Sequence, residues 1–308
     1  SRFPNVMSTM KFKEGKTVHT ALPARRSGIG RKRLNSVLIT TIKIVVALIM
    51  FFPIIWILSS SLKSLVEVGQ FPPTILPKEP QWSNFERILS EEAFYRYLRN
   101  TLLLIVGTTV GTLLSSSLVA YPLARMEFPG KSLFFTLIIA TMLVPNISLI
   151  IPQYIMFGWF GWLDSLRPMI VPAFFAYPYN VFLFRQFFRS IPKELDEAAS
   201  IDGCSRAGTF FRILVPLSKP TFATIGVLSS VFWWNELTQP IIYLNRDTWR
   251  PLTVAMMSHY AHFGDNPFTT TWHTLMSASV LMILPPMLLY LFGSKFLVQG
   301  IKTSGMKG

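Results

Sequence analysis

The sequence has few charged residues and almost no cysteine. Asp, Glu, Lys and Arg make up 14% of its 308 residues, whereas an ordinary soluble domain carries about 25%. The composition excludes a disordered chain and a coiled coil. The single cysteine, Cys204, excludes an intrachain disulfide and a cysteine-only metal site. What is abundant is apolar, with 51% hydrophobic residues and 26 phenylalanines. Such a chain is expected to have lipid as its main surroundings.

Six apolar stretches are long enough to cross a bilayer, which takes about 20 helical residues. They are 37–62, 101–123, 133–156, 168–188, 217–243 and 275–297. Prolines inside these stretches should kink the helices, and neighbouring helices can support such kinks. We therefore expect an all-α integral membrane protein with six transmembrane helices, the first of them uncleaved. A basic cytosolic tail, 1–36, precedes the membrane domain, 37–308.

The distribution of Lys and Arg predicts the orientation of the chain. Six spans place both termini on one side, together with two of the connecting segments. The segments on that side, which are 1–36, 122–132, 185–219 and 294–308, hold 20 Lys and Arg. The opposite segments, which are 61–100, 152–167 and 236–273, hold 8. The positive-inside rule then places both termini in the cytosol. The net charge of +14 is therefore better explained by topology than by nucleic-acid binding.

The cytosolic segment 190–220 has the pattern of two short helices joined by a glycine. Ser190 is placed to cap the first helix, with Pro192 just inside it and acidic residues in its first turn. Gly203 permits the turn to the second helix. The first helix has a mildly apolar face made of Leu195, Ala198, Ala199 and Ile201. A compact amphipathic hairpin of this kind is suited to docking into another protein.

This hairpin resembles the EAA loop of binding-protein-dependent ABC importers. The resemblance is carried by Glu197-Ala198-Ala199, Gly203, Ile213 and Pro216, with Val215 in place of the usual Leu. In that family the loop is the coupling helix, which sits in a cleft of the ATPase subunit. The residues that the resemblance assigns to ATPase coupling are Glu197, Ala198, Ala199, Asp202, Gly203, Ile213 and Pro216.

The resemblance extends over most of the chain. Ser61-Leu62-Lys63, Asn84-Phe85 and Asn100-Thr101 are similar to the first outer loop of the sugar-importer subfamily, and Ala120 to Arg125 is similar to its first inner loop. Gly305 to Gly308 resembles the tail of the second permease subunit of maltose-type importers. The chain would then be a multi-pass protein of the bacterial inner membrane that forms half of a carbohydrate pathway. An oligosaccharide is the expected substrate, and an acidic one such as alginate is a further guess.

The resemblance also implies a set of partners. These are a second permease subunit, two ATPase subunits and an external solute-binding protein. The ATP and Mg would be bound by the ATPase subunits, and no cofactor is expected in this chain.

Two groups of polar residues are candidates for further contacts. Polar groups inside a membrane should face protein or a watery cavity. The candidate substrate-pathway residues are Tyr177, Tyr179, Asn180, Asn235 and Glu236. Hydrogen bonding between helices is the alternative role for these side chains. In maltose-type importers the loop after the fifth span reaches into the solute-binding protein, and here it would contribute Asn245, Arg246, Asp247, Asp265 and Asn266. The alternative is a simple linking loop.

Other motifs carry no chemistry. Gly15-Lys16-Thr17 lacks the first glycine of a P-loop, since Met10 stands in its place. His259 and His262 have no acidic residue between them, so a solvated loop is preferred over a metal site. We expect no catalytic residue and no metal in this chain. Gly107 and Gly111 form a GxxxG pattern that predicts close helix packing.

Other classes of membrane protein fit the sequence less well. An ion-coupled secondary transporter usually holds ionisable groups at mid-membrane, but Lys43 and Glu236 both lie near the ends of spans. A membrane-embedded glycosyl- or phosphotransferase needs a cluster of carboxylates or histidines facing one side of the bilayer, and none is visible. A non-catalytic permease subunit is therefore the preferred interpretation.

Overall fold

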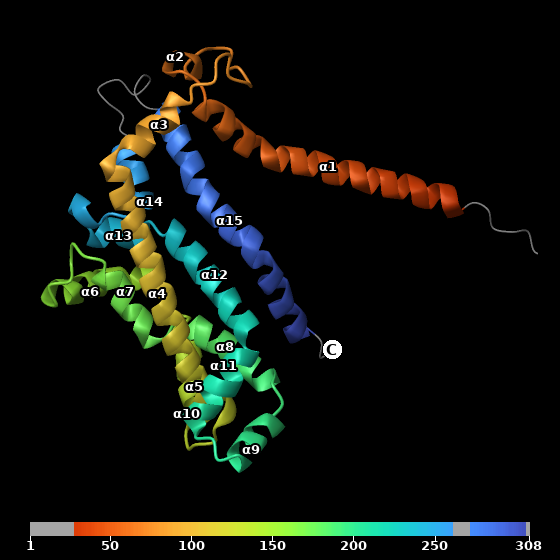
Figure 1. Cartoon of the computed structure of the whole chain (residues 1–308), viewed down its shortest axis with the longest axis vertical. Helices are drawn as coiled ribbons and strands as arrows, with labels where there is room; N and C mark the ends of the chain where they lie inside the picture. Colours follow the sequence, from red (N-terminus) through yellow and green to blue (C-terminus); the bar gives the residue numbers. More distant parts are fainter. Residues whose placement is uncertain (1–27, 261–271, 306–308) are drawn as a thin grey trace, which may run out of the picture. The chain divides into compact units, whose positions relative to one another are not determined.

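The computed structural model describes residues 28–260 and 272–305, and side chains at 36–258, 260 and 272–294. Every regular element in these ranges is helical (Figure 1). The α-helices are α1 (Gly28–Ser61), α2 (Leu65–Val68), α3 (Ser83–Ser90), α4 (Glu92–Arg125), α5 (Lys131–Thr141), α6 (Asn146–Trp159), α7 (Arg167–Ile170), α8 (Pro178–Ser190), α9 (Glu194–Ile201), α10 (Arg206–Thr209), α11 (Val215–Leu217), α12 (Lys219–Asn235), α13 (Thr238–Tyr243), α14 (Leu252–Ala255) and α15 (Trp272–Gly305). Short 3₁₀ turns cover Val171–Phe175 and Asp247–Trp249, and π-helical turns cover Phe210–Leu214 and Met256–Tyr260.

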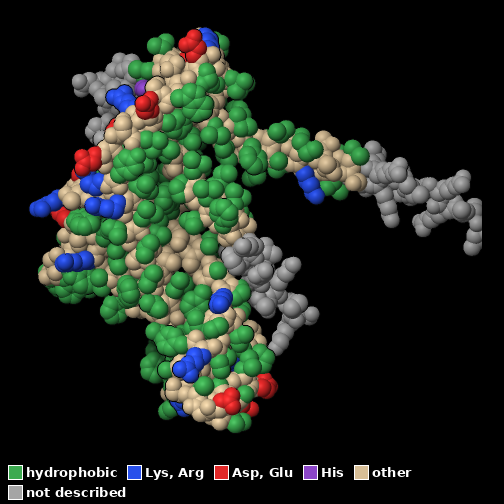
Figure 2. All heavy atoms as spheres, viewed as in Figure 1, with side chains coloured by type: hydrophobic (Ala, Val, Ile, Leu, Met, Phe, Trp, Pro, Cys, Tyr) green, Lys and Arg blue, Asp and Glu red, His purple; other side chains and the backbone are tan. Residues whose placement is uncertain are grey.

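The chain divides into two units, Ser1–Pro53 and Ile54–Gly308. The described part of the first unit is the N-terminal portion of α1, whose apolar side chains from Val37 to Phe52 are exposed. The second unit contains the other helices. Its visible face is largely hydrophobic, and acidic side chains gather at the end formed by α9 (Figure 2). An apolar exterior of this extent is expected of a protein that lies in lipid.

Three helices in the described residues are long and apolar enough to cross a membrane. They are Ser36–Ser61, Glu92–Arg125 and Trp272–Ser294, and they match the first, second and sixth predicted spans. The third predicted span, 133–156, is a bent pair of α5 and α6, which meet at 93°. A second bent pair, Arg206–Leu217 with α12, meets at 75°, but its first half lies in the predicted cytosolic hairpin. The fifth predicted span, 217–243, therefore corresponds to α12, which ends at Asn235, followed by α13. Counting each pair as one span gives up to five candidates. The count of six spans remains a prediction.

The fourth predicted span, 168–188, does not form one continuous helix. It consists of α7, a 3₁₀ turn and α8, and the break lies at Ala176, which has a left-handed φ of 65°. Prolines at 168, 172 and 178 remove backbone donors along this stretch. Two serines of α4 bond to the backbone groups that the break leaves free. Ser115 Oγ donates to the Ala173 carbonyl (2.9 Å) and accepts from the Ala176 N–H (3.1 Å). Ser116 Oγ accepts from the Tyr177 N–H (3.2 Å). Such partners are what makes irregular backbone tolerable within a membrane protein.

The GxxxG pattern of α4 lies where the broken segment crosses this helix. A Cβ atom added to Gly107 would meet Ile170 at 3.0 Å. One added to Gly111 would lie 2.7 Å from the Phe174 ring and 3.1 Å from the backbone of Ala173. The prediction of close helix packing is therefore confirmed.

Replacing Gly111 by Ala should destabilise the folded protein by about 1–3 kcal/mol, because the added methyl group overpacks the contact with Phe174. Gly226 is the matched control, since a Cβ there would meet Leu113 at an ordinary 3.7 Å. Gly226→Ala should be neutral or slightly stabilising, because Ala favours helix. Thermal unfolding of the detergent-solubilised variants measures both effects. Equal unfolding temperatures for the two variants would contradict the close contact.

The helices enclose two hydrophobic clusters, and α4 contributes to both. The aromatic cluster includes Tyr97, Trp234, Tyr243, Leu252 and Tyr260. The hairpin cluster includes Tyr121, Phe184, Phe188, Phe210 and Leu214. They lie toward opposite ends of α4, the first near α3 and α13 and the second near α9 (Figure 1). The long helix α4 therefore connects the two ends of the second unit.

Candidate functional site

The predicted cytosolic hairpin is present, with one correction at its start. Helix α8 continues through Ser190, whose hydroxyl donates to the Phe187 carbonyl (2.7 Å). Ser190 therefore ends α8, and the prediction that it caps the next helix is wrong. Helix α9 begins at Glu194, after Lys193, and its N-terminus has no side-chain cap.

The glycine turn that follows α9 is confirmed. Gly203 has a φ of 76°, in the left-handed region that favours glycine. The Cys204 N–H donates to the Ala199 carbonyl (2.9 Å), and the Gly203 N–H donates to the Ser200 carbonyl (3.1 Å). This pair of bonds is the Schellman arrangement that ends a helix. Ser205 then caps α10, since its hydroxyl accepts from the Gly208 N–H (3.1 Å). The direction of the chain after α9 is thus held by local backbone bonds.

The residues of the EAA motif face in different directions. Glu197 and Ala198 are exposed, whereas Ala199 is 4% exposed and packs inward. Ile201 is 87% exposed, an unusual position for a large apolar side chain, and Asp202 is exposed beside it. Of the four residues predicted to share one apolar face, Leu195, Ala198 and Ile201 are exposed, and Ala199 alone is buried. The outward surface of α9 therefore presents acidic side chains, the small side chain of Ala198 and the exposed side chain of Ile201.

Ile213 and Pro216 belong to the second limb of the hairpin. Ile213 is half-buried in the π-helical turn Phe210–Leu214, and Pro216 is exposed in α11. A proline cannot donate the next hydrogen bond of a regular helix, and a π-turn before it accommodates that loss. Ile213 and Pro216 therefore lie in the irregular segment that connects α10 to α12.

The C-terminal end of α4 holds both limbs of the hairpin. The Tyr121 hydroxyl donates to the Arg206 carbonyl (3.1 Å), and its ring packs on Phe210 with centroids 5.2 Å apart. Arg125 Nε lies 3.5 Å from Asp196 Oδ2 of α9. Neither Asp196 nor Arg125 is among the site residues predicted from the sequence. Their positions in the sequence could have indicated a role, because Arg125 ends the inner-loop motif and Asp196 directly precedes the EAA residues.

Several candidate pathway residues have local partners. Asn235 Nδ2 donates to the Val231 carbonyl (2.7 Å), and Glu236 accepts from the Gln239 N–H (2.9 Å) at the start of α13. Tyr177 is half-buried against the aromatic cluster. Tyr179 is exposed and Asn180 is half-buried, both in the first turn of α8. Asn235 and Glu236 are therefore bonded to nearby backbone, and Tyr177 packs against the aromatic cluster.

The segment after α13 packs on the start of α4. Asp247 accepts from the Tyr97 hydroxyl (2.9 Å) and forms ion pairs with Arg96 and, at 3.8 Å, with Arg250. Asn100, in α4, donates to the carbonyls of Thr248 (2.9 Å) and Arg250 (3.1 Å). Asp247 is thus engaged within the chain.

The neighbouring candidates for contact with the binding protein are more accessible. The backbone N–H groups of Asn245 and Arg246 bond to Asp164, while the Arg246 side chain is 81% exposed. The candidates Asp265 and Asn266, like His262, lie outside the described residues, as does the His259 side chain. Arg246 is therefore the described candidate that is best placed for an external contact.

Two more features complete this end of the second unit. Asn84 Nδ2 donates to the carbonyls of Ser61 (2.9 Å) and Lys63 (3.0 Å), so these motif residues are hydrogen-bonded to one another between α1 and α3. Burial, followed by the negative charge of Glu91, raises the pKa of Tyr260, which keeps this hydroxyl protonated.

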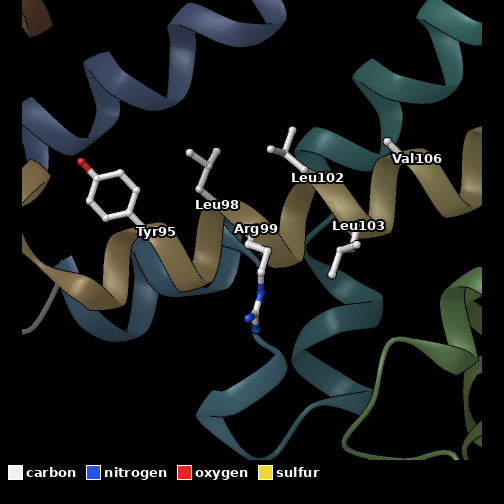
Figure 3. A pocket seen from close by; sticks show the side chains of 6 residues that line it. All are labelled: Tyr95, Leu98, Arg99, Leu102, Leu103 and Val106. Carbon is white, nitrogen blue, oxygen red and sulfur yellow. The ribbon is translucent and has the colours of Figure 1, made fainter.

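Two surface grooves in the described part of the chain are lined by residues other than the candidate pathway residues. One groove of about 380 Å³ runs along α4 and is almost wholly apolar (Figure 3). It is lined by Tyr95, Leu98, Arg99, Leu102, Leu103 and Val106. A second groove, of about 510 Å³, lies where α4, α12 and α15 meet and includes Thr109 and Ser230. Apolar grooves of this kind suit helix or lipid packing better than binding of a sugar.

Comparison with known proteins identifies the family. Residues 107–303 match the family described as "Binding-protein-dependent transport system inner membrane component". The arabinooligosaccharides transport system permease protein AraQ of Bacillus subtilis is 33% identical over 88% of this chain and 95% of its own length. The melibiose/raffinose/stachyose import permease protein MelC of the same organism is 33% identical over 88% of this chain and 96% of its own length.

Solved structures agree with this assignment. A chain of a bacterial ABC transporter that imports the acidic polysaccharide alginate matches 86% of this chain and 97% of its own, with a TM-score of 0.76 and 25% identity. A chain from an alginate transporter in complex with an alginate-bound periplasmic protein shares the fold, with a TM-score of 0.61 and 16% identity. This chain therefore belongs to the binding-protein-dependent transport system inner membrane components, and it is a permease subunit of an ABC importer.

Proposed function

We propose that α9 is the coupling helix through which partner ATPase subunits drive this permease. The observation that carries the proposal is the outward surface of α9, where Glu197, Ala198 and Ile201 are exposed on a hairpin whose second limb is anchored in the hairpin cluster by Phe210 and Leu214. A large exposed apolar side chain next to small and acidic ones is typical of a surface that a partner covers. ATP and Mg are bound by those partners, and this chain contributes no catalytic residue.

The membrane arrangement is a second part of the proposal. Six spans with both termini in the cytosol follow if α5 with α6, α7 with α8, and α12 alone each count as one span beside the three long helices. The excess of Lys and Arg on the α9 side supports this orientation. The chain is then a multi-pass protein of the bacterial inner membrane and pairs with a second permease subunit to enclose the pathway.

The proposed substrate is a carbohydrate, most specifically an oligosaccharide. The names of two relatives specify arabinooligosaccharides and the sugars melibiose, raffinose and stachyose, and a solved neighbour imports alginate. Delivery by an external solute-binding protein is supported by the complex in which such a protein is present. Tyr177, Tyr179 and Asn180 are the proposed sugar contacts, since aromatic rings and amides suit sugar rings and hydroxyls. Arg246 is proposed to contact the binding protein.

The energy conversion is a two-state switch. The loaded binding protein favours one state from outside, and closure of the ATPase pair on ATP favours it from the cytosol. ATP hydrolysis ends the closure of the ATPase pair, and the transmembrane helices then return to the other state.

Disulfide crosslinking in the assembled importer tests the docking of α9. Ala198→Cys should form a crosslink with a cysteine placed in the ATPase cleft, because Ala198 is exposed on α9. Val66→Cys is the matched control, since Val66 is 83% exposed but lies on α2, at the other end of the second unit. Both variants also carry Cys204→Ser, because the native cysteine is half-buried in the same hairpin, and the control should then form no crosslink with the ATPase. Failure of Ala198→Cys to crosslink in every nucleotide state would contradict the proposal.

A further inference from the structure

The junction between α4 and α9 contains an ion pair whose charged groups lie close together but form no hydrogen bond. We call this arrangement open. Arg125 is the last residue of α4, and its side chain is 3% exposed. Asp196 lies in the first turn of α9, and its side chain is 26% exposed. Their nearest charged atoms, Nε and Oδ2, are 3.5 Å apart, and Nε has no hydrogen-bond partner. The two side chains attract each other without forming a hydrogen bond.

The unsatisfied atoms of this pair match a specific closed geometry. Arg125 Nε and Nη2 and Asp196 Oδ1 are buried and have no hydrogen-bond partner. Buried polar atoms are ordinarily bonded, because removing them from water is costly. A bidentate pair joins two guanidinium N–H groups to both carboxylate oxygens at about 2.8 Å. Three of the four atoms that such a pair needs are therefore the unsatisfied ones, and a short approach of α9 to α4 would satisfy them together.

The other contacts at the end of α4 are already made. The Tyr121 hydroxyl bonds to the Arg206 carbonyl of the second limb (3.1 Å). Arg185 Nε, in α8, donates to the Leu123 carbonyl (3.2 Å). The C-terminal end of α4 is thus bonded to α8 and to α10, while its polar link to α9 is the open pair of Arg125 and Asp196. This leaves the first limb as the part of the hairpin with room to move.

We propose that Arg125 and Asp196 are positioning residues of the importer, and that engagement of α9 by an ATPase subunit closes them into a bidentate pair. The inference rests on the proposed docking of α9. With the pair closed, α9 and α4 move as one body, so a displacement of the coupling helix reaches a helix long enough to span the membrane. With the pair open, α9 tilts about the turn at Gly203 without carrying α4 along.

The test measures substrate transported per ATP hydrolysed by the complete importer in liposomes. Arg125→Lys keeps the positive charge but cannot form a two-pronged contact. We expect this ratio to fall about fivefold in Arg125→Lys. Asp196→Asn should lower it about tenfold, because it leaves a buried guanidinium without its counter-charge. Glu127→Gln is the matched control. It removes the carboxylate of an exposed ion pair with Lys131 (3.1 Å) in the loop after α4, and the ratio should stay at the wild-type value.

Two further measurements separate the possible explanations. The crosslink of Ala198→Cys to the ATPase should persist in Arg125→Lys, which shows that docking is intact and transmission is lost. If that crosslink is absent even from the otherwise unmodified importer, the proposed docking itself is contradicted. The combined variant Arg125→Met/Asp196→Asn should transport at least as much substrate per ATP as Asp196→Asn alone, because it no longer contains a buried guanidinium without a counter-charge. Wild-type transport per ATP in Arg125→Lys would overturn the bidentate closure, whatever the other variants do.

Discussion

Replacing Ala198 by Trp should abolish transport while the chain still inserts and folds. Ala198 is exposed on α9, so a larger side chain meets no neighbour within the chain. In the docked importer the same side chain would overpack the ATPase cleft. Overpacking costs about 1–3 kcal/mol, and the upper value is about a hundredfold in a binding equilibrium. Uptake of labelled substrate into liposomes measures the loss.

Ala198→Ser is the matched control for this prediction. Its side chain is close to Ala in size, so docking and transport should stay within about twofold of the wild type, as is usual for surface substitutions. The amount of each variant in the membrane fraction shows that insertion is unaffected. Normal uptake by Ala198→Trp would mean that this face of α9 is not held in a cleft.

Gly203→Pro should be equally damaging, for a reason internal to the hairpin. Gly203 has a φ of 76°, whereas proline holds φ near about −65°. The substitution also removes the N–H that donates to the Ser200 carbonyl. A proline misplaced in this way costs about 3 kcal/mol or more. The hairpin should lose its geometry, and uptake should fall about a hundredfold, with the membrane helices still inserted.

Gly203→Asn separates this effect from a general intolerance of side chains at the turn. Asn adopts the left-handed conformation more readily than other residues with side chains. A Cβ at Gly203 would meet nothing within 4 Å. This variant should therefore keep most of its transport, and Gly203→Ala should fall between the two. Loss of uptake in Gly203→Asn comparable to that in Gly203→Pro would show that the open space beside Gly203 is needed by the partner instead.

The sequence was sufficient to predict features that depend on nearby residues. The turn at Gly203 follows from its place between two short helical patterns, and the structure confirms it. The close packing at Gly107 and Gly111 follows from their spacing on one helical face. Apolarity likewise predicts which stretches are long enough to cross lipid. In each case the decisive interactions are local or depend only on residue size.

Features that depend on distant partners were not predictable in this way. The apolarity of 168–188 is evident from its hydropathy, but hydropathy does not tell a kinked helix from a broken one. The broken form is supported by hydrogen bonds from Ser115 and Ser116, which lie far away in the sequence. The same holds for Asp247, whose partner Tyr97 is 150 positions distant. The pairing of Arg125 with Asp196 also needs the fold, because each residue alone is typical of a charged cytosolic surface.

The length of α4 has a thermodynamic consequence. Its 34 residues measure about 51 Å at 1.5 Å per residue. Near one tip, Tyr97 bonds to Asp247, and at the other tip Arg125 faces Asp196. In the proposed importer, linkage makes the coupling between the two ends of α4 reciprocal: whatever factor closure of the ATPase subunits adds to the affinity for the solute-binding protein, binding of that protein must add to closure. A solute-binding protein without sugar that binds weakly should therefore be a poor activator of hydrolysis for the same physical reason.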